Sequence, residues 1–143
     1  MKSLDSWLAE YSESHQNKTN QLVHRICVPL ILWSIVGFSS LLRMGDSIWT
    51  SAAPALCLAV LVFYFMLGLK PFAEMVVQLG ICLALCAYLE NRLERAWILY
   101  AAVFVTAWIG QAAGHAIEGK KPSFFKDLQF LLIGPLWIVR KHG

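Results

Sequence analysis

The chain has 143 residues, of which 58% are hydrophobic and 15% are charged, and its mean hydropathy is +0.58. Soluble domains average about 45–50% apolar and about 25% charged residues, so a soluble core of this size could not bury the excess. The composition therefore excludes a soluble domain and predicts lipid contact, and the small, scattered net charge of +3 excludes the basic surface of a nucleic-acid-binding protein.

The N-terminal segment precedes the first long apolar stretch. Its 25 residues are polar and lack an apolar core region, so they predict no cleavable signal peptide. Four apolar side chains recur in it at the spacing i, i+3, i+4 and i+7, which is typical of a short amphipathic helix at a membrane interface. These side chains are Leu4, Trp7, Leu8 and Tyr11. Asn20 is expected to cap the N-terminus of the helix that follows.

Four apolar stretches approach the length of a membrane-spanning helix, which is about 20 residues with a range of about 17–25. They are residues 26–42, 48–69, 72–89 and 96–114. The third qualifies if Glu74 lies at the interface. A fifth run, residues 130–139, is too short to span, and Gly134 and Pro135 interrupt it. We therefore expect an interfacial or re-entrant segment there.

These elements predict an all-α fold. The expected architecture is a polytopic membrane helical bundle of four transmembrane helices plus short interfacial or re-entrant segments, in a single integral membrane domain of residues 1–143. The four cysteines lie inside the apolar stretches, where we expect them to pack rather than to form disulfides or a zinc site. They are Cys27, Cys57, Cys82 and Cys86.

The basic residues indicate an orientation in the membrane. Four spans place both termini on one side, which then carries most of the Lys and Arg residues of the connecting segments. These are Lys2, Lys18, Arg25, Lys70, Lys120, Lys121 and Lys126, with Arg140 and Lys141 if the last run does not cross. The other side carries Arg43, Arg92 and Arg95. The positive-inside rule therefore places both termini in the cytoplasm, of a bacterial inner membrane or of the endoplasmic reticulum alike.

Two groups of polar residues flank the first and fourth spans. The first group consists of Tyr11, His15, Asn20, His24 and Pro29. The second consists of Gln111, Gly114, His115, Glu118 and Pro122. In the four-span topology all three histidines lie on one membrane face. Polar side chains at membrane depth are functional candidates, although single histidines at an interface are often simply solvated.

The residue types in these groups suit a metal ion. Imidazoles and a carboxylate can hold iron(II) and leave positions open for oxygen and substrate, but they also admit zinc, manganese or copper. Gly110 and Gly114 form a small-xxx-small pair that favours close approach of another helix and would bring His115 toward the first span. Arg25, Lys120 and Lys121 share the histidine face, where they set the topology and could also bind a lipid carboxylate.

Together the two groups resemble the Mpo-type 2-hydroxy fatty acid dioxygenases, a family of small membrane proteins. The second group continues the match as Gln111-Ala-Ala-Gly-His115-Ala-Ile-Glu118-Gly-Lys-Lys-Pro122, and Gly134-Pro-Leu-Trp137 gives a weaker third match. The resemblance covers nearly the whole chain, including its length and the four-span layout. Ser123 departs from the usual alanine, and Arg140-Lys141 departs from a more apolar, often acidic ending.

The resemblance implies an oxidoreductase of fatty acid alpha-oxidation. Family members use Fe(2+) and molecular oxygen, without 2-oxoglutarate, to shorten a 2-hydroxy fatty acid by one carbon with release of carbon dioxide. By the same resemblance His15, His24 and His115 are the expected iron ligands. Glu118 is expected to be a further ligand or a partner of one, and Asn20 to orient a ligand or the substrate. Arg25, Lys120 or Lys121 would offset the charge of the substrate carboxylate.

Two other interpretations fit the same residues. A non-enzymatic haem or electron-carrier bundle would use His24 and His115 as axial ligands and would show a Soret band. A small structural or accessory membrane protein would hold no metal, and replacing the histidines by alanine would affect folding at most.

Overall fold

The computed structural model describes residues 1–119 and the helix of residues 124–140, with side chains in that helix described from residue 129 on. Within these ranges the structure contains six α-helices and one short 3-10 helix, and no strand, which confirms the predicted all-α class. In chain order the elements are α1 (Leu4–Glu13), α2 (Lys18–Leu41), η1 (Ile48–Thr50), α3 (Ala52–Leu67), α4 (Leu69–Glu90), α5 (Ala96–Glu118) and α6 (Phe124–Arg140).

The chain forms two compact units. Unit 1 consists of Met1–Leu30 and Val105–Gly143, and unit 2 consists of Ile31–Phe104. Unit 1 therefore contains α1, α6, the first part of α2 and the last part of α5, whereas unit 2 contains α3, α4 and the remaining parts of α2 and α5.

Three of the described helices, not four, are long and apolar enough to cross a membrane: α2, α4 and α5, with 24, 22 and 23 residues. The predicted span of residues 48–69 was wrong because that stretch does not form one helix. The Ser51 hydroxyl caps a new helix, α3, which has 16 residues and ends at Gly68, where φ is 134°. Glycine adopts positive φ without strain, so the chain turns there. At 1.5 Å per residue α3 is about 24 Å long, less than a hydrocarbon core of about 30 Å.

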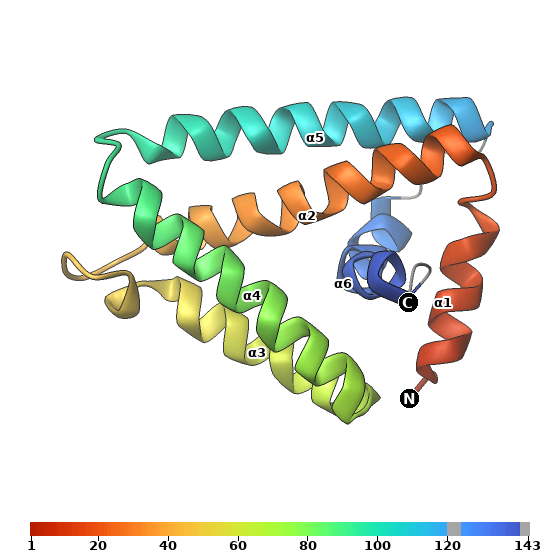
Figure 1. The fold of residues 1–143 in the computed structure, drawn as a ribbon, viewed down its shortest axis with the longest axis horizontal. Helices are drawn as coiled ribbons and strands as arrows, with labels where there is room; N and C mark the ends of the chain where they lie inside the picture. Colours follow the sequence, from red (N-terminus) through yellow and green to blue (C-terminus); the bar gives the residue numbers. More distant parts are fainter. Residues whose placement is uncertain (120–123, 141–143) are drawn as a thin grey trace. The chain divides into compact units, whose positions relative to one another are not determined.

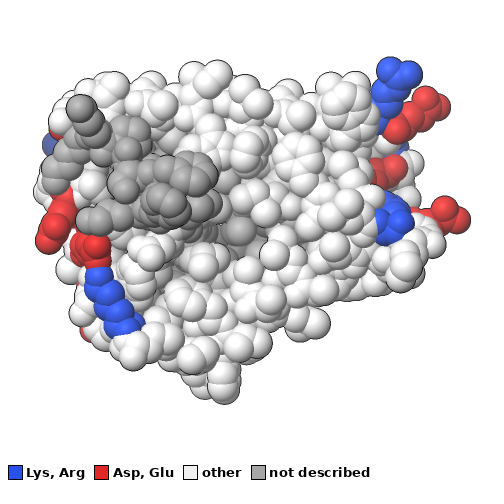
Figure 2. All heavy atoms as spheres, turned by 180° about the vertical axis from the view of Figure 1, so that it is seen from behind, with Lys and Arg blue, Asp and Glu red and all other residues white. Residues whose placement is uncertain are grey.

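The placement of both termini in the cytoplasm was derived from an even number of spans, and it stays a prediction. Lipid contact does not depend on that number. Large apolar side chains such as Val77, Ile81 and Ile109 are more than 60% exposed. Figure 2 shows that most of the surface on the drawn face is uncharged, with few blue or red atoms. These apolar helices indicate an integral membrane protein.

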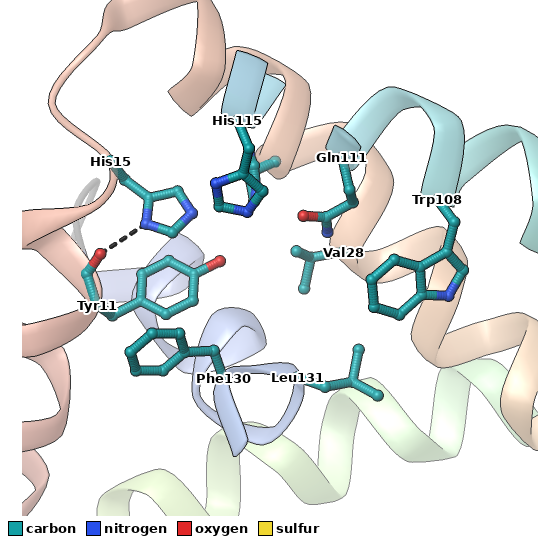
Figure 3. Close-up of a pocket in the computed structure, with 9 residues that line it drawn as sticks. Tyr11, His15, Val28, Trp108, Gln111, His115, Phe130 and Leu131 are labelled. Carbon is teal, nitrogen blue, oxygen red and sulfur yellow. Dashed lines mark hydrogen bonds between the residues drawn. The ribbon is translucent and has the colours of Figure 1, made fainter. Parts of the chain in front are cut away.

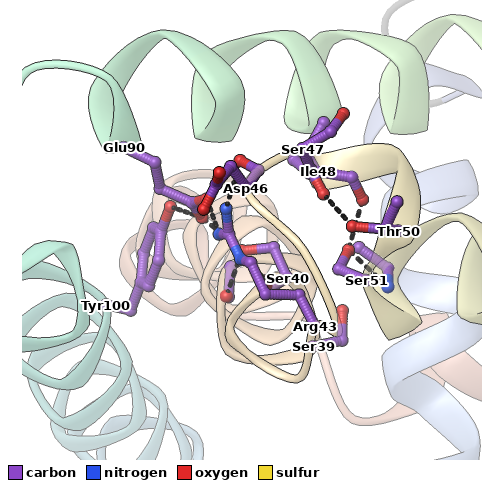
Figure 4. Close-up of polar contacts among 12 residues, drawn as sticks. Ser39, Ser40, Arg43, Asp46, Ser47, Ile48, Thr50, Ser51, Glu90 and Tyr100 are labelled. Atoms are coloured by element: carbon purple, nitrogen blue, oxygen red, sulfur yellow. Dashed lines mark hydrogen bonds and ion pairs between the residues drawn. The ribbon is translucent and has the colours of Figure 1, made fainter.

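In unit 2, α3 and α4 lie side by side (Figure 1). A buried polar cluster, the Glu90 cluster, joins the end of α4 to two other segments. The Glu90 carboxylate accepts hydrogen bonds from the Ser40 hydroxyl, from the Arg43 guanidinium and, at 2.8 Å, from the Tyr100 hydroxyl (Figure 4). The Tyr100 ring lies 2.5 Å from where a Cβ on Gly37 would stand, so glycine lets the two helices approach.

In unit 1, α1 packs against α6. The Ser3 hydroxyl caps α1, which confirms the predicted N-terminal helix. Trp137 Nε1 donates a hydrogen bond to Ser12 Oγ at 2.8 Å and fixes the contact of the two helices. The predicted interruption at Gly134 and Pro135 was wrong, because α6 runs through both residues. The placement of α6 at the membrane interface stays a prediction.

The N-cap of α2 also differs from the prediction. Asn17, not Asn20, holds this position, because its Oδ1 accepts from the backbone N–H groups of Thr19 at 2.8 Å and of Asn20 at 3.3 Å. Asn20 lies inside α2, one turn before His24, and its side chain is fully buried. Because Asn20 does not cap the helix, its side-chain amide is available for other contacts.

Candidate metal centre

Three buried histidines of unit 1 converge. One ring nitrogen from each of His15, His24 and His115 lies within 4.8 Å of the other two. The side chains are 2%, 1% and 7% exposed. Their ring centroids are 4.3 Å apart for His15 and His24, 5.0 Å for His24 and His115, and 5.6 Å for His15 and His115. The structure thus brings together the three histidines that the sequence singled out.

Each histidine comes from a different segment, and glycine lets two of these segments meet. His15 follows α1, His24 lies in α2, and His115 lies in the last turn of α5. A Cβ on Gly114 would stand 2.4 Å from Asn20 Oδ1 and 3.3 Å from the His24 ring, and one on Gly110 would stand 2.7 Å from Cys27 Sγ. This confirms the close helix approach that the glycine spacing predicted.

Backbone carbonyls orient two of the rings. His15 Nδ1 lies 2.6 Å from the Tyr11 carbonyl oxygen, and His24 Nδ1 lies 2.9 Å from that of Asn20. A carbonyl only accepts, so Nδ1 carries the proton in each ring and donates it, which leaves Nε2 with a lone pair. Histidines that bind metals usually donate their other N–H in this way. The Tyr11 ring stacks on His15 at 4.1 Å and 1°, which further fixes that imidazole.

The polar atoms of this site fit a metal ion. Among the described residues His24 Nε2 has no hydrogen-bond partner, although it is buried. A buried polar atom left in this state costs about 1–3 kcal/mol. Other described side chains, such as Trp33, also have such an atom, but His24 belongs to a group of three converging imidazoles. A metal ion bound by the three imidazoles would satisfy this lone pair, and the set of three nitrogen donors leaves coordination positions for other ligands.

Glu118 and Asn20 lie beside the histidines but turn to the backbone. Glu118 Oε1 accepts from the N–H of Gln16 at 2.9 Å, and Oε2 accepts from the N–H of Asn17 at 2.9 Å and from Asn20 Nδ2 at 3.0 Å. Asn20 Nδ2 also donates to the Ser14 carbonyl at 3.2 Å. The described structure does not group Glu118 with the three imidazoles. Both side chains instead hold the turn that carries His15 and the N-terminus of α2, where a carboxylate is favourable.

The basic residues expected near a substrate carboxylate are not part of this arrangement as described. Arg25 follows His24 in α2 but does not line the cavity beside the histidines. Lys120 and Lys121 lie outside the described residues. A role for any of the three toward a carboxylate stays a prediction.

A cavity of about 20 Å³ adjoins the imidazoles (Figure 3). A volume of about 10–15 Å³ holds one water molecule, so this cavity admits an ion or a small polar group but not a whole fatty acid. Besides the histidines, it is lined by Tyr11, Val28, Trp108, Gln111, Phe130 and Leu131. Most of these residues were not predicted to take part in the site. Helical spacing could have identified three of them. Val28 lies one turn after His24, and Gln111 and Trp108 lie one and two turns before His115.

The whole chain also matches a known family. Residues 1–142 match the family described as 2-hydroxy-palmitic acid dioxygenase Mpo1-like. The chain belongs to this Mpo1-like family. It is 33% identical over 140 residues to the 2-hydroxy-palmitic acid dioxygenase MPO1 of Saccharomyces cerevisiae, an alignment that covers 95% of this chain and 77% of the yeast protein. No solved structure matches the chain.

Membership in the Mpo1-like family confirms the resemblance predicted from the two histidine-bearing groups. The family is one of fatty acid dioxygenases, and together with the apolar helices it indicates an oxidoreductase in contact with a lipid bilayer. The histidine cluster of His15, His24 and His115 is the group of described residues in this family member that could hold a metal ion.

Proposed function

We propose that this protein is an iron(II)-dependent dioxygenase that shortens 2-hydroxy fatty acids by one carbon. The observation that carries the proposal is the convergence of three buried imidazoles in a chain of the Mpo1-like family. His15, His24 and His115 would hold the iron. Glu118 and Asn20 act as positioning residues, because they fix the backbone from which His15 and His24 project.

The proposed reaction balances without a further reductant. A 2-hydroxy acid and one molecule of oxygen give a fatty acid shorter by one carbon, carbon dioxide and water. The bond between C1 and C2 breaks, C2 becomes the new carboxyl carbon, and the four electrons released by the two carbons reduce the oxygen. Iron(II), when bound, supplies the electron transfer to oxygen that a closed-shell organic acid cannot undergo directly.

The protein's own residues would prepare this reaction. The Tyr11 and Asn20 carbonyls hold two imidazoles in the tautomer with a lone pair on Nε2. Burial of all three rings excludes bulk water from the centre. The small cavity admits the polar end of the substrate, while the acyl chain would extend from it toward lipid.

The direct test uses detergent-purified protein loaded anaerobically with iron(II) and then given oxygen and 2-hydroxypalmitate. We expect mass spectrometry to detect pentadecanoic acid with the wild type and none with His115→Ala. Met44→Ala, at a residue that is 99% exposed in unit 2, serves as the purification control and should match the wild type. Product without bound iron, or iron bound without product from any 2-hydroxy acid, would contradict the proposal. Protein that binds no metal at all would favour the structural alternative.

A further inference from the structure

The cavity beside the histidines has a polar end and an apolar end. The imidazoles and the Tyr11 hydroxyl face one end, whereas Trp108 and Leu131 lie at the other in Figure 3. Val28 lies between the two ends, and Phe130 packs edge-on against the Tyr11 ring, with ring centroids 5.2 Å apart. A molecule with a small polar head and a hydrocarbon chain matches this division. One further polar side chain, Gln111, interrupts the apolar lining.

Gln111 is placed to meet the polar head of such a molecule. It lies in α5 one turn before His115, on the same face of the helix, and its side chain is 8% exposed. Figure 3 shows its amide directed into the cavity on the side of His115. A buried amide is costly unless its donors and its acceptor find partners, so an amide turned toward a cavity favours a bound polar group there.

We propose that Gln111 binds the head group of the substrate and makes the site select for the 2-hydroxyl group. This inference rests on the proposed function, because the head group is that of a 2-hydroxy fatty acid. A glutamine amide offers both kinds of hydrogen bond that this head needs. Its Oε1 can accept from the hydroxyl while its Nε2 donates to the carboxylate. An unsubstituted fatty acid would leave Oε1 without its donor, and sites of this kind reject such analogues strongly.

The side chain of Gln111 is uncharged, which also suits it to bind a carboxylate head beside a metal ion. A second carboxylate at this place would repel the substrate carboxylate, and a lysine or arginine would repel a metal ion held by the adjacent histidines. An amide forms hydrogen bonds with the head without altering the charge of the centre. A residue that only packs would not discriminate between acids with and without the 2-hydroxyl group, so selectivity for the hydroxyl separates the two roles.

The test measures binding rather than turnover. Dissociation constants for 2-hydroxypalmitate and palmitate would be determined under anaerobic conditions, on metal-free and iron(II)-loaded protein, for the wild type and for Gln111→Leu. We expect the wild type to prefer the hydroxy acid by about tenfold or more, which corresponds to about 1.4 kcal/mol. In Gln111→Leu the preference should fall to within about threefold, while the amount of iron bound per chain stays the same.

Two further variants keep the test decisive. Leu131→Ala alters the apolar lining and should weaken binding of both acids by a similar factor, so that their ratio is retained. Gln111→Glu keeps the size of the side chain and should weaken binding of 2-hydroxypalmitate far more than binding of the uncharged hexadecane-1,2-diol. If Gln111→Leu folds poorly, Gln111→Met takes its place, because methionine nearly keeps the length of the side chain. A head-binding role predicts that Gln111→Met loses the preference for the hydroxy acid, whereas a packing role predicts that the preference is kept.

The outcomes distinguish this inference from the proposed function. A wild type without preference for the hydroxy acid, or a Gln111→Leu variant that keeps the full preference, would overturn the role of Gln111 even if pentadecanoic acid is formed. A wild type that prefers the hydroxy acid through Gln111 but yields no pentadecanoic acid with oxygen would support the role of Gln111 and overturn the proposed reaction.

Discussion

Each unit contains one buried polar cluster, and the two clusters differ in how their polar atoms are satisfied. In the Glu90 cluster of unit 2, the carboxylate accepts from a hydroxyl, a guanidinium and a phenol. Arg43 is satisfied further, because its Nε donates to the Ser40 carbonyl at 2.9 Å. In the histidine cluster of unit 1, carbonyls accept from Nδ1 of His15 and of His24, whereas His24 Nε2 has no hydrogen-bond partner among the described residues.

This difference separates a structural cluster from a functional one. A carboxylate surrounded by donors has its bonding capacity used by the protein itself, so the Glu90 cluster joins helix ends and has little left for a ligand. The buried Nε2 of His24 is an acceptor that no described donor uses, and it belongs to a group of three imidazoles that could hold a cation. Burial alone therefore does not indicate function, but a buried acceptor without a donor in a group of metal-ligating side chains does.

The largest expected effect comes from removing a histidine. His24→Ala should abolish iron binding and lower activity by more than about 100-fold, because loss of a ligand exceeds the about 10–100-fold loss seen for outer partners of a metal. The measurements are iron content after anaerobic loading and the rate of pentadecanoic acid formation. Retention of one iron per chain in His24→Ala would show that the imidazoles are not the ligands.

Breaking the Glu90 cluster should lower the thermal stability of the protein and leave its iron binding unchanged. Glu90→Ala leaves the partly buried Arg43 without its carboxylate, and loss of one partner of a buried pair costs about 3–5 kcal/mol. We expect a lower midpoint of thermal unfolding in detergent, measured by circular dichroism, with normal iron content in the protein that remains folded. Loss of iron from folded Glu90→Ala would contradict the separation of the two clusters.

Glu118 sharpens the comparison, because it is a carboxylate within the functional unit. If it acts by holding Gln16 and Asn17, then Glu118→Ala should weaken iron binding by about 10–100-fold and regain activity at saturating iron. Titration of activity against iron(II) measures both properties. Activity that is not regained at any iron concentration, as expected for His24→Ala, would instead identify Glu118 as a ligand.

The smallest effect is expected at the helix approach. Gly114→Ala places a methyl group 2.4 Å from Asn20 Oδ1, so the Asn20 side chain or the helix must shift, at a cost of about 1–3 kcal/mol. Gly80→Ala in α4 is the matched control, because no atom lies within 4 Å of the added group, and it should stabilise the helix by about 0.5–1 kcal/mol. Equal unfolding midpoints in detergent for the two variants would contradict the close approach.

Local pattern predicted much of the fold and the site. The spacing of Leu4, Trp7, Leu8 and Tyr11 predicted α1, and hydropathy located the three long helices. Hydropathy failed at residues 48–69. A hydropathy value averaged over many residues does not detect the hydroxyl cap at Ser51 or the positive φ at Gly68. The three histidines were found because they fall on one face together with Asn20 and Glu118, in two groups that resemble a known family.

Other features of the site depend on contacts between distant residues and were beyond local pattern. Nothing in the spacing of His115 and Glu118 indicates that the carboxylate turns to backbone N–H groups 101 and 102 residues earlier in the chain. Asn17 and Asn20 are equally good caps by residue type, and only the tertiary contact of Asn20 with Glu118 distinguishes them. Gln111 had the right helical spacing, but its significance depends on a cavity that α6 helps to line.

The same long-range contact determines when the centre can form during synthesis. Gln16 and Glu118 are separated by 102 residues, and a ribosome adds about 5–20 residues per second, so roughly 5–20 seconds pass between the emergence of one and of the other. For most of that interval the nascent chain contains only two of its three converging histidines, and throughout it the turn that carries the first lacks its carboxylate. Metal loading should therefore follow completion of α5, so that bound iron reports a fully synthesised and assembled chain.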